Sequence, residues 1–248
     1  HYMLIDTAGV RRRGKVFETI EKFSVIKTMQ AIESTQVVVL VLDGQESVTE
    51  QDAHLAAYIL DAGRALVVAV NKWDALSADA RTAVKADLAR KLHFLDFAET
   101  CYISALKHKG FIEVLRAVDV ALQAAMAKLP TPALTRVLAE AVLQHQPAMR
   151  RGVRPKLRYA HQGGNNPPRI IIHGSHLGAM QTAYTRFLEK TFRRAFELIG
   201  TPLRVEYKEG ANPYSEDKPK RKLGIGVVTM RRRKNLQREA LKAKKAKG

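Results

Sequence analysis

The sequence predicts an α/β domain built on a doubly wound parallel sheet, followed by a smaller α+β domain. Near-continuous runs of Val, Leu and Ile alternate with amphipathic segments over residues 1–130, which is typical of a parallel sheet covered on both faces. Over residues 131–211 the order changes to helix, strand, strand, helix, strand. The segment KLPTPAL at 128–134 separates the two domains, because two prolines in three residues interrupt a helix. Residues 212–248 form a basic, low-complexity tail.

In the first domain, strands and helices are expected to alternate along the chain. The opening run HYMLI predicts a buried strand that delivers Asp6 to a glycine turn. Further strands are expected at 36–44, 65–74 and 100–105, and helices at 17–33, 49–63, 78–93 and 110–128. Thr49 is the expected N-cap of the second of these helices, which closes on Gly63.

In the second domain, two helices and three strands are expected. The helices are predicted at 133–145 and 180–199, and the strands at 156–162, 169–174 and 202–209. The loop GGNNPP between the first two strands is turn-forming.

The charge is divided unequally between the two halves. Residues 1–130 carry 16 Lys and Arg against 16 Asp and Glu, whereas residues 131–248 carry 26 against 8, so the whole net charge of +18 lies in the second half. This asymmetry predicts a neutral domain joined to one that binds a polyanion. An anionic membrane surface is the competing partner, but no clear amphipathic basic helix with aromatic anchors is found.

Composition excludes several other classes of protein. No apolar run of about 18 residues is present to span a membrane, and the start shows no secretory signal. The single cysteine, Cys101, rules out an intrachain disulfide and fits a reducing compartment. Its apolar neighbours predict a buried structural thiol.

Three short segments that follow strands carry the candidate chemistry. They are Asp6-Thr7-Ala8-Gly9, Asn71-Lys72-Trp73-Asp74 and Ser104-Ala105-Leu106. Ligands of open parallel sheets bind at the carboxyl ends of the strands, and all three segments are expected there.

The second segment is suited to recognition of guanine. The carboxylate of Asp74 can accept both the N1–H and the 2-amino group of a guanine edge, whereas adenine offers no such pair and leaves the carboxylate unpaired. The amide of Asn71 can tie neighbouring loops together, and the stem of Lys72 can lie over the base. The N–H of Ala105 is suited to the guanine carbonyl oxygen.

The first segment is suited to phosphate and to a hard cation. Asp6 can reach Mg²⁺ through water, and the N–H of Gly9, which has no Cβ, can meet a γ-phosphate. Each motif alone is weak, and a strand-end aspartate is frequently only a helix cap. Their order and strand contexts together favour the nucleotide interpretation.

At this point the sequence resembles a known family. Residues 1–130 are similar to a G domain of the Era-like class, and LIDTAGVRRRGKV resembles the second G domain of the bacterial double-Era-like GTPases, the Der or EngA family. PKLRYAHQGGNNPPRIIIHG and GTPLRVEYKEGANPY resemble the KH-like domain that follows it there. The resemblance covers residues 1 to 235. It implies binding and hydrolysis of GTP to GDP with Mg²⁺, coupled to assembly of the large ribosomal subunit on rRNA in the bacterial cytoplasm, and no membrane partner.

The sequence departs from a working GTPase in three respects. No GxxxxGK[ST] phosphate loop is present, and the switch threonine is absent as well. We therefore expect a fragment that lacks the first strands of its G domain and a preceding G domain that packs on the KH-like domain. Such a fragment is expected to bind GTP weakly and to be inactive alone, with no direct metal ligand. Val10 also stands where Ras-like proteins use glutamine to orient water, so no catalytic residue is assigned. Arg11, Arg12 and Arg13 are either switch cations or a solvated triplet.

The basic residues of the second half are the candidate RNA contacts. They are Arg150, Arg151, Arg154, Lys156, Arg158, Arg193, Arg194, Lys218, Lys220, Arg221, Lys222, Arg231, Arg232, Arg233 and Lys234. Such contacts give salt-dependent binding with little sequence preference; the alternative for the tail is a solvated face. The GXXG clamp of KH domains is not intact, because Gly174 and Gly178 have three residues between them. His145, His161, His173 and His176 are expected in loops or facing RNA rather than on a metal.

Two functions from different classes remain open. The chain is either part of a GTPase for assembly of the large ribosomal subunit, or a non-enzymatic RNA-binding module in which the remnant of the G domain is a scaffold.

Overall fold

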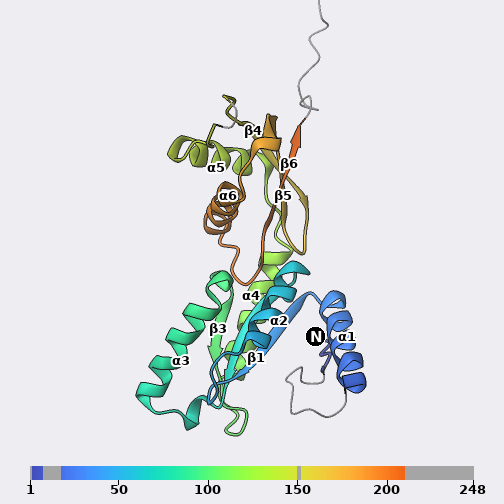
Figure 1. Cartoon of the computed structure of the whole chain (residues 1–248), viewed down its shortest axis with the longest axis vertical. Helices are drawn as coiled ribbons and strands as arrows, with labels where there is room; N and C mark the ends of the chain where they lie inside the picture. The colour runs from blue at the N-terminus through green and yellow to red at the C-terminus, as the bar shows by residue number, and fades with distance from the viewer. Residues whose placement is uncertain (1, 8–17, 150–151, 210–248) are drawn as a thin grey trace, which may run out of the picture. The chain divides into compact units, whose positions relative to one another are not determined.

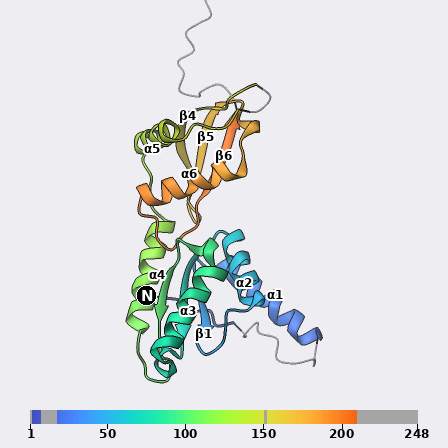
Figure 2. The same cartoon turned by 60° about the vertical axis from the view of Figure 1, so that its left-hand side comes forward.

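Two three-stranded sheets organise the chain (Figures 1 and 2). The computed structural model describes residues 2–7, 18–149 and 152–209, and it describes no side chains for residues 18–25. Of the tail at 212–248, nothing lies inside the described residues.

The first sheet is parallel, and β2 (Ala65–Asn71) is its central strand. Its strands are β1 (Val37–Asp43), β2 and β3 (Glu99–Tyr102), and they lie side by side in that order. The register places Asp43 opposite Asn71 and Val70 opposite Tyr102. The carboxyl ends of the strands therefore meet at one edge, as the sequence predicts.

Helices cover both faces of this sheet. On one face, α2 (Glu50–Asp61) and α3 (Ala78–Lys91) pack against the strands and bury Ile59 and Leu88. On the other face, α4 (Phe111–Ala125) buries Ala117 and Ala121 against β2 and β3 (Figure 2). Cys101 belongs to this second core and is buried, as expected, and burial raises the pKa of its thiol.

The helix α1 (Glu18–Ser34) contacts the end of α2 through its last turns. The hydroxyl of Tyr58 donates to the carboxylate of Glu33 at 2.8 Å, and the guanidinium of Arg64 donates to the carbonyl of Glu33 at 2.5 Å. The only buried positions of α1 with described side chains are Thr28 and Ile32.

Local sequence explains where α2 and α3 begin. Thr49 accepts a hydrogen bond from the N–H of Asp52 at 3.1 Å, and the carboxylate of Asp52 accepts from the N–H of Thr49 at 2.9 Å. This reciprocal capping box satisfies two N–H groups that the first turn leaves without partners. Ser77 caps α3 in the simpler way, by accepting from the N–H of Ala80.

Two predictions for the first sheet are wrong. Residues 2–7 form no strand, and Met3 and Leu4 are 87% and 91% exposed, because no strand among the described residues pairs with this run. The run at β1 is a strand but is not buried on both faces. Val39 and Val41 are 37% and 58% exposed, since α4 packs mainly on β2.

The second sheet is mixed and is covered on one face. β4 (Lys156–Gly164) pairs antiparallel with β5 (Arg169–Ser175), which pairs parallel with β6 (Arg204–Glu209). The helices α5 (Thr131–Gln144) and α6 (Thr182–Ala195) pack on the sheet. The fully buried members of this core are Leu134, Leu138, Ala160, Ile170, Ile172, Leu188 and Phe192. The element order is the predicted one, although α6 is shorter than expected.

Three short 3-10 turns complete the described structure. They are η1 (Trp73–Ala75), η2 (His93–Leu95) and η3 (Leu177–Ala179). Among the described residues, no helix is both long enough and apolar enough to cross a membrane.

Candidate functional site

The loops that follow β2 and β3 are joined by the side chain of Asn71. Its Oδ1 accepts the N–H of Lys72 at 2.8 Å and the N–H of Ala105 at 2.9 Å. A backbone bond from the N–H of Trp73 to the carbonyl of Ile103, at 3.1 Å, runs alongside. The structure thus brings together the two segments, 71–74 and 104–106, that the sequence placed at one edge of the sheet.

The contact made by Asn71 involves a group that has another expected role. The N–H of Ala105, expected to face a guanine carbonyl oxygen, donates to Asn71 instead. Asn71 ends β2, which pairs with β3, so its side chain reaches the loop that follows β3.

Lys72 adopts a left-handed backbone conformation, with φ of 60°. This conformation is uncommon for a residue with a Cβ and turns the chain sharply into η1. Its ammonium pairs with the carboxylate of Asp43, at the end of β1, at 2.6 Å. The stem that was expected to lie over a base is therefore anchored at its tip by the neighbouring strand.

Asp74 lies beside the 104–109 loop. Its carboxylate accepts from the hydroxyl of Ser104, which is buried, and pairs with the ammonium of Lys107 at 3.0 Å. The hydrogen bond from Ser104, and next to it the bond from Lys107, lower the pKa of Asp74. The carboxylate is therefore ionised and oriented by two donors.

The loop that carries Lys107 is tightly folded. The backbones of Ser104 and Lys109 exchange two hydrogen bonds, both at 3.0 Å, and His108 between them has φ of 52°. The N–H of Lys107 donates to the hydroxyl of Ser104 at 3.2 Å. Leu106 is at the tip and is 86% exposed, so its side chain has no packing role here.

Gly44 lets the end of β1 approach the Asn71 loop. Its N–H donates to the carbonyl of Asn71 at 2.9 Å, and a Cβ at this position would lie 2.8 Å from the same oxygen. Any other residue would push the two loops apart.

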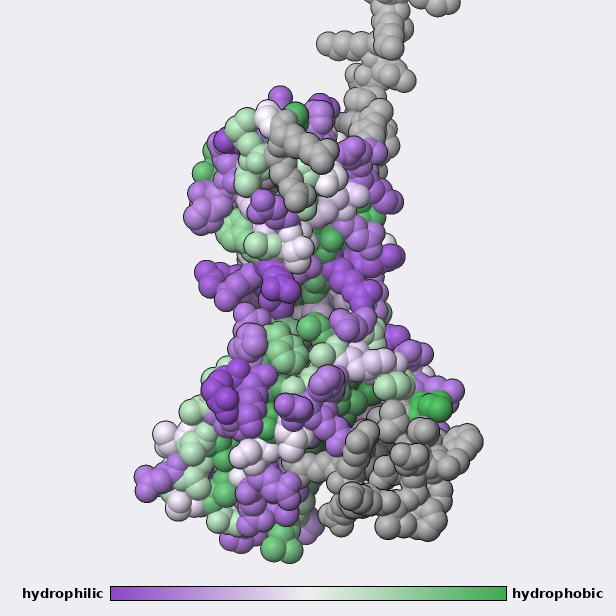
Figure 3. Space-filling model, viewed as in Figure 1, coloured by the Kyte–Doolittle hydropathy of each residue, from purple (hydrophilic) through white to green (hydrophobic). Residues whose placement is uncertain are grey.

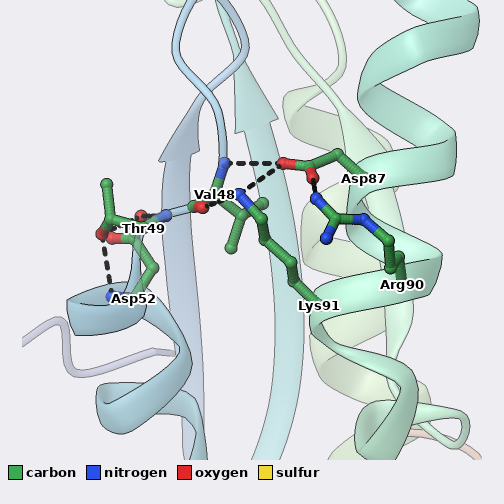
Figure 4. Close-up of polar contacts among 6 residues, drawn as sticks. All are labelled: Val48, Thr49, Asp52, Asp87, Arg90 and Lys91. Atoms are coloured by element: carbon green, nitrogen blue, oxygen red, sulfur yellow. Dashed lines mark hydrogen bonds and ion pairs between the residues drawn. The ribbon is translucent and has the colours of Figure 1, made fainter.

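A polar network anchors the loop between β1 and α2 to α3 (Figure 4). The carboxylate of Asp87 accepts the N–H of Val48 at 3.0 Å and pairs with Lys91 at 3.2 Å and Arg90 at 2.6 Å. Lys91 also donates to the carbonyl of Val48. Burial alone would raise the pKa of Asp87, but Arg90, Lys91 and the N–H of Val48 together lower it. Thr49, the N-cap of α2, directly follows Val48, so the loop is fixed at its α2 end.

Sequence reasoning missed these supporting residues. Asp43, Asp87 and Lys107 belong to no motif that the sequence analysis singled out. Asp43 could have been found from the sequence, because Asp43-Gly44 follows an apolar run in the same way as Asp6 does, with a glycine turn after it. Nothing in the sequence alone pairs Asp87 with Val48, since 39 residues separate them.

Trp73 packs against the protein rather than facing a ligand. Its ring lies 4.1 Å from that of Tyr102, measured between centroids, and the guanidinium of Arg81 lies 5.5 Å from the Trp73 centroid.

The predicted phosphate and Mg²⁺ segment is only partly described. Asp6 and Thr7 belong to the exposed stretch at 2–7, whereas Ala8 and Gly9 lie outside the described residues, as do Val10 and Arg11 to Arg13. The structure therefore leaves this expectation as a prediction.

The basic candidates of the second half differ in how exposed they are. Arg154, Lys156, Arg158 and Arg194 are exposed. On the face shown in Figure 3, hydrophilic side chains are interspersed with apolar ones. Arg193 is engaged instead: it pairs with Asp96 at 3.2 Å and its guanidinium lies 5.0 Å from the ring centroid of Phe97. Arg150, Arg151 and the candidates from Lys218 to Lys234 lie outside the described residues.

Of the two glycines found in place of a GXXG loop, Gly174 and Gly178, the first has a structural role. A Cβ at Gly174 would lie 2.0 Å from the carbonyl oxygen of Lys156, whereas nothing lies within 4 Å of one at Gly178. The N–H of Gly178 donates to the carboxylate of Glu209 at 3.1 Å. Gly174 is thus required for β4 and β5 to pair closely.

Two of the histidines are not in loops. His161 lies on β4 and His173 on β5, where their rings stack with centroids 5.0 Å apart, and Tyr159 stacks on His173 at 4.5 Å. Burial, with His161 and Lys208 nearby, lowers the pKa of His173. No group of three or more potential metal ligands occurs within the described ranges.

Comparison with known proteins gives matches over both parts of the chain. Residues 128–208 match the family described as the KH-domain-like of EngA bacterial GTPase enzymes, C-terminal, and residues 1–124 match the elongation factor Tu GTP binding domain. The GTPase Der of Thiobacillus denitrificans is 59% identical over 241 residues, which are 96% of this chain and 51% of that protein. The GTPase Der of Burkholderia lata is 60% identical over 215 residues, 87% and 48% of the two. The chain therefore spans about half the length of these curated relatives.

A solved structure is also among the matches. The crystal structure of Aquifex aeolicus Era bound to GDP·AlF4⁻ has a TM-score of 0.40 and 19% sequence identity, over 84% of this chain and 76% of that one.

Proposed function

The chain belongs to the Der (EngA) family of bacterial GTPases, as a C-terminal part that joins a G domain to a KH-like domain, and on that premise we propose that the 71–74 and 104–106 loops bind the guanine of GTP or GDP. The single observation that carries this proposal is the double hydrogen bond of Asn71, which holds the two loops together.

The base is recognised by donors and acceptors at the edge of the sheet. Asp74, kept ionised by Ser104, accepts the N1–H and the 2-amino group of guanine. Because the N–H of Ala105 is already committed to Asn71, we assign the guanine carbonyl oxygen to the N–H of Leu106, the next along the loop. The aliphatic stem of Lys72 covers one face of the base.

Hydrolysis belongs to the proposal for the longer protein. There Asp6, Thr7, Ala8 and Gly9 would act on the γ-phosphate and on Mg²⁺, a hard cation for which a carboxylate oxygen is a suitable partner. Mg²⁺ supplies neutralisation of phosphate charge when bound. This sequence has no GxxxxGK[ST] loop, so we expect these 248 residues alone to be inactive.

The second half is proposed to bind ribosomal RNA. Support comes from its charge, because the whole net charge of +18 lies beyond residue 130, and from the exposure of Arg154, Lys156, Arg158 and Arg194. The proposed partner is the large ribosomal subunit during its assembly in the bacterial cytoplasm. A preceding G domain is proposed to pack on the KH-like domain.

The test is a comparison of two nucleotides. Titration of the chain with GDP and with ADP, followed by the amide resonances of residues 104–106, should give shifts with GDP alone. Asp74→Asn, which replaces one of the two acceptor oxygens by a donor NH2 group, should abolish the preference. Equal shifts with GDP and ADP in the wild-type chain would contradict guanine recognition.

A second candidate function is a non-enzymatic RNA-binding module. The absence of a phosphate loop in this sequence favours it for the 248 residues taken alone. Filter binding of rRNA with and without GTP separates the two, since a pure RNA module binds equally in both conditions.

A further inference from the structure

Lys107 occupies the carboxylate that the proposed function assigns to guanine. Its ammonium lies 3.0 Å from Oδ2 of Asp74, on side chains that are 55% and 21% exposed. Two features of the loop hold it there: the N–H of Lys107 donates to the hydroxyl of Ser104, and the backbones of Ser104 and Lys109 pair on either side.

We propose that Lys107 is an intramolecular competitor of guanine for Asp74, and so sets how tightly and how selectively the site takes a nucleotide. This inference rests on the proposed function and deepens it.

Competition follows from the side on which both groups reach the carboxylate. A guanine edge needs both oxygens of the Asp74 carboxylate, one for N1–H and one for the 2-amino group. The side chain of Lys107 is 55% exposed and contacts Oδ2 from the solvent side, where the base must also approach, so the base displaces the ammonium to water. Ser104 reaches the carboxylate from within the fold and is not displaced, because its hydroxyl is buried.

The same ion pair weakens discrimination against adenine. A site built around one carboxylate rejects adenine because the carboxylate then has no partner. With Lys107 in place, the carboxylate keeps a partner when adenine or nothing is bound. The lysine therefore weakens the binding of guanine and also lowers the cost of binding adenine, so the difference in affinity between the two bases becomes smaller.

The magnitude is that of an exposed ion pair. Such pairs contribute little in water, so removing the ammonium should tighten GDP binding by only about 1.5- to 5-fold. Raising the salt concentration screens the pair and should shrink the difference.

The variant Lys107→Met tests this, with Lys109→Met as its matched control. Both remove one positive charge from the same loop, and losing a cation should on its own weaken binding of an anionic nucleotide. The competitor role predicts the opposite sign for Lys107 alone. Amide shifts of residues 104–106 in the 248-residue chain give the dissociation constant for GDP at millimolar concentrations, and the same titration with ADP shows whether adenine binds.

A second readout needs no nucleotide. The side-chain carboxyl resonance of Asp74 should titrate at higher pH in Lys107→Met than in the wild-type chain or in Lys109→Met, because one of the two donors that lower its pKa is gone.

The outcomes separate this inference from the function on which it rests. Tighter GDP binding by Lys107→Met, with no gain in ADP binding, supports it. If GDP binds the wild-type chain but Lys107→Met binds as Lys109→Met does, or more weakly, the function stands and the competitor role is overturned. If neither the wild-type chain nor Lys107→Met responds to GDP, both fail.

Discussion

Asn71 is the residue on which the proposed site depends most directly, and its replacement by alanine gives the sharpest prediction. The change removes the acceptor of two N–H groups, those of Lys72 and Ala105, at 2.8 and 2.9 Å. A hydrogen bond of this kind contributes about 0.5–1.5 kcal/mol net. Both bonds are exposed, so water replaces part of the loss, and we expect about 1–2 kcal/mol for the pair.

That loss acts on a loop whose backbone is already strained. A left-handed residue with a Cβ costs about 1–2 kcal/mol, and Lys72, with φ of 60°, is held in this conformation by the bonds that Asn71 accepts. Without them the 71–74 loop should open locally while the strands β1 to β3 remain paired.

Hydrogen exchange measures this directly. Protection of the amides of Lys72 and Ala105 should fall about 5- to 30-fold in Asn71→Ala, since each 1.4 kcal/mol is a factor of ten. Asn71→Asp keeps an acceptor oxygen and is the matched control, with protection close to that of the wild type. Unchanged protection in Asn71→Ala would refute the view that this side chain holds the two loops together.

Three further predictions concern the rest of the chain. Gly174→Ala should destabilise the chain by about 1–3 kcal/mol in urea unfolding, through overlap with the first carbonyl of β4, whereas Gly178→Ala, with open space around it, should be neutral. Asp87→Asn should lower the free energy of unfolding at neutral pH. Because the folded pKa of Asp87 is lowered, the difference in stability between variant and wild type should persist at pH above the ordinary pKa of 3.8 and vanish as the pH falls through the lower folded pKa. A difference in stability that persists in acid contradicts the role of the ion pairs. Arg193→Ala should reduce thermal stability by removing its contacts within the fold, whereas exposed Arg194→Ala should reduce only rRNA affinity at low salt.

The strands and the motif loops could be predicted from the sequence because the residue patterns that indicate them are local. An all-apolar run such as that of β2 has no stable place except a covered sheet, and the residues that follow it fall at the carboxyl edge by the rule for parallel strands. The capping box at Thr49 is local in the same sense. Pattern and position therefore agree wherever the decisive contacts lie within a few residues.

The errors and omissions depend on partners that are distant in sequence. The apolar run at 2–7 has the composition of a strand, but a strand forms only against another strand, and none among the described residues pairs with it. Val41 is exposed for a similar reason, because helix α4 covers a different part of the sheet. Asp87 meets Val48 only after α3 has packed beside the β1–α2 loop.

Two ion pairs at the proposed base site join motif residues to residues outside the motifs. Lys72 and Asp74 are neighbours in one motif, yet each pairs outside it: Lys72 with Asp43 on β1, and Asp74 with Lys107 on the loop after β3. Lys72 is thereby held by the end of β1, and Asp74 is held by the loop that follows β3. The two pairs differ in consequence, because Asp43 fixes a lysine whose stem remains available to a base, whereas Lys107 occupies the carboxylate that the base requires. Of the two supporting residues outside the motif, only Lys107 should therefore oppose guanine binding, and the sign of its substitution should be the reverse of that at Asp43.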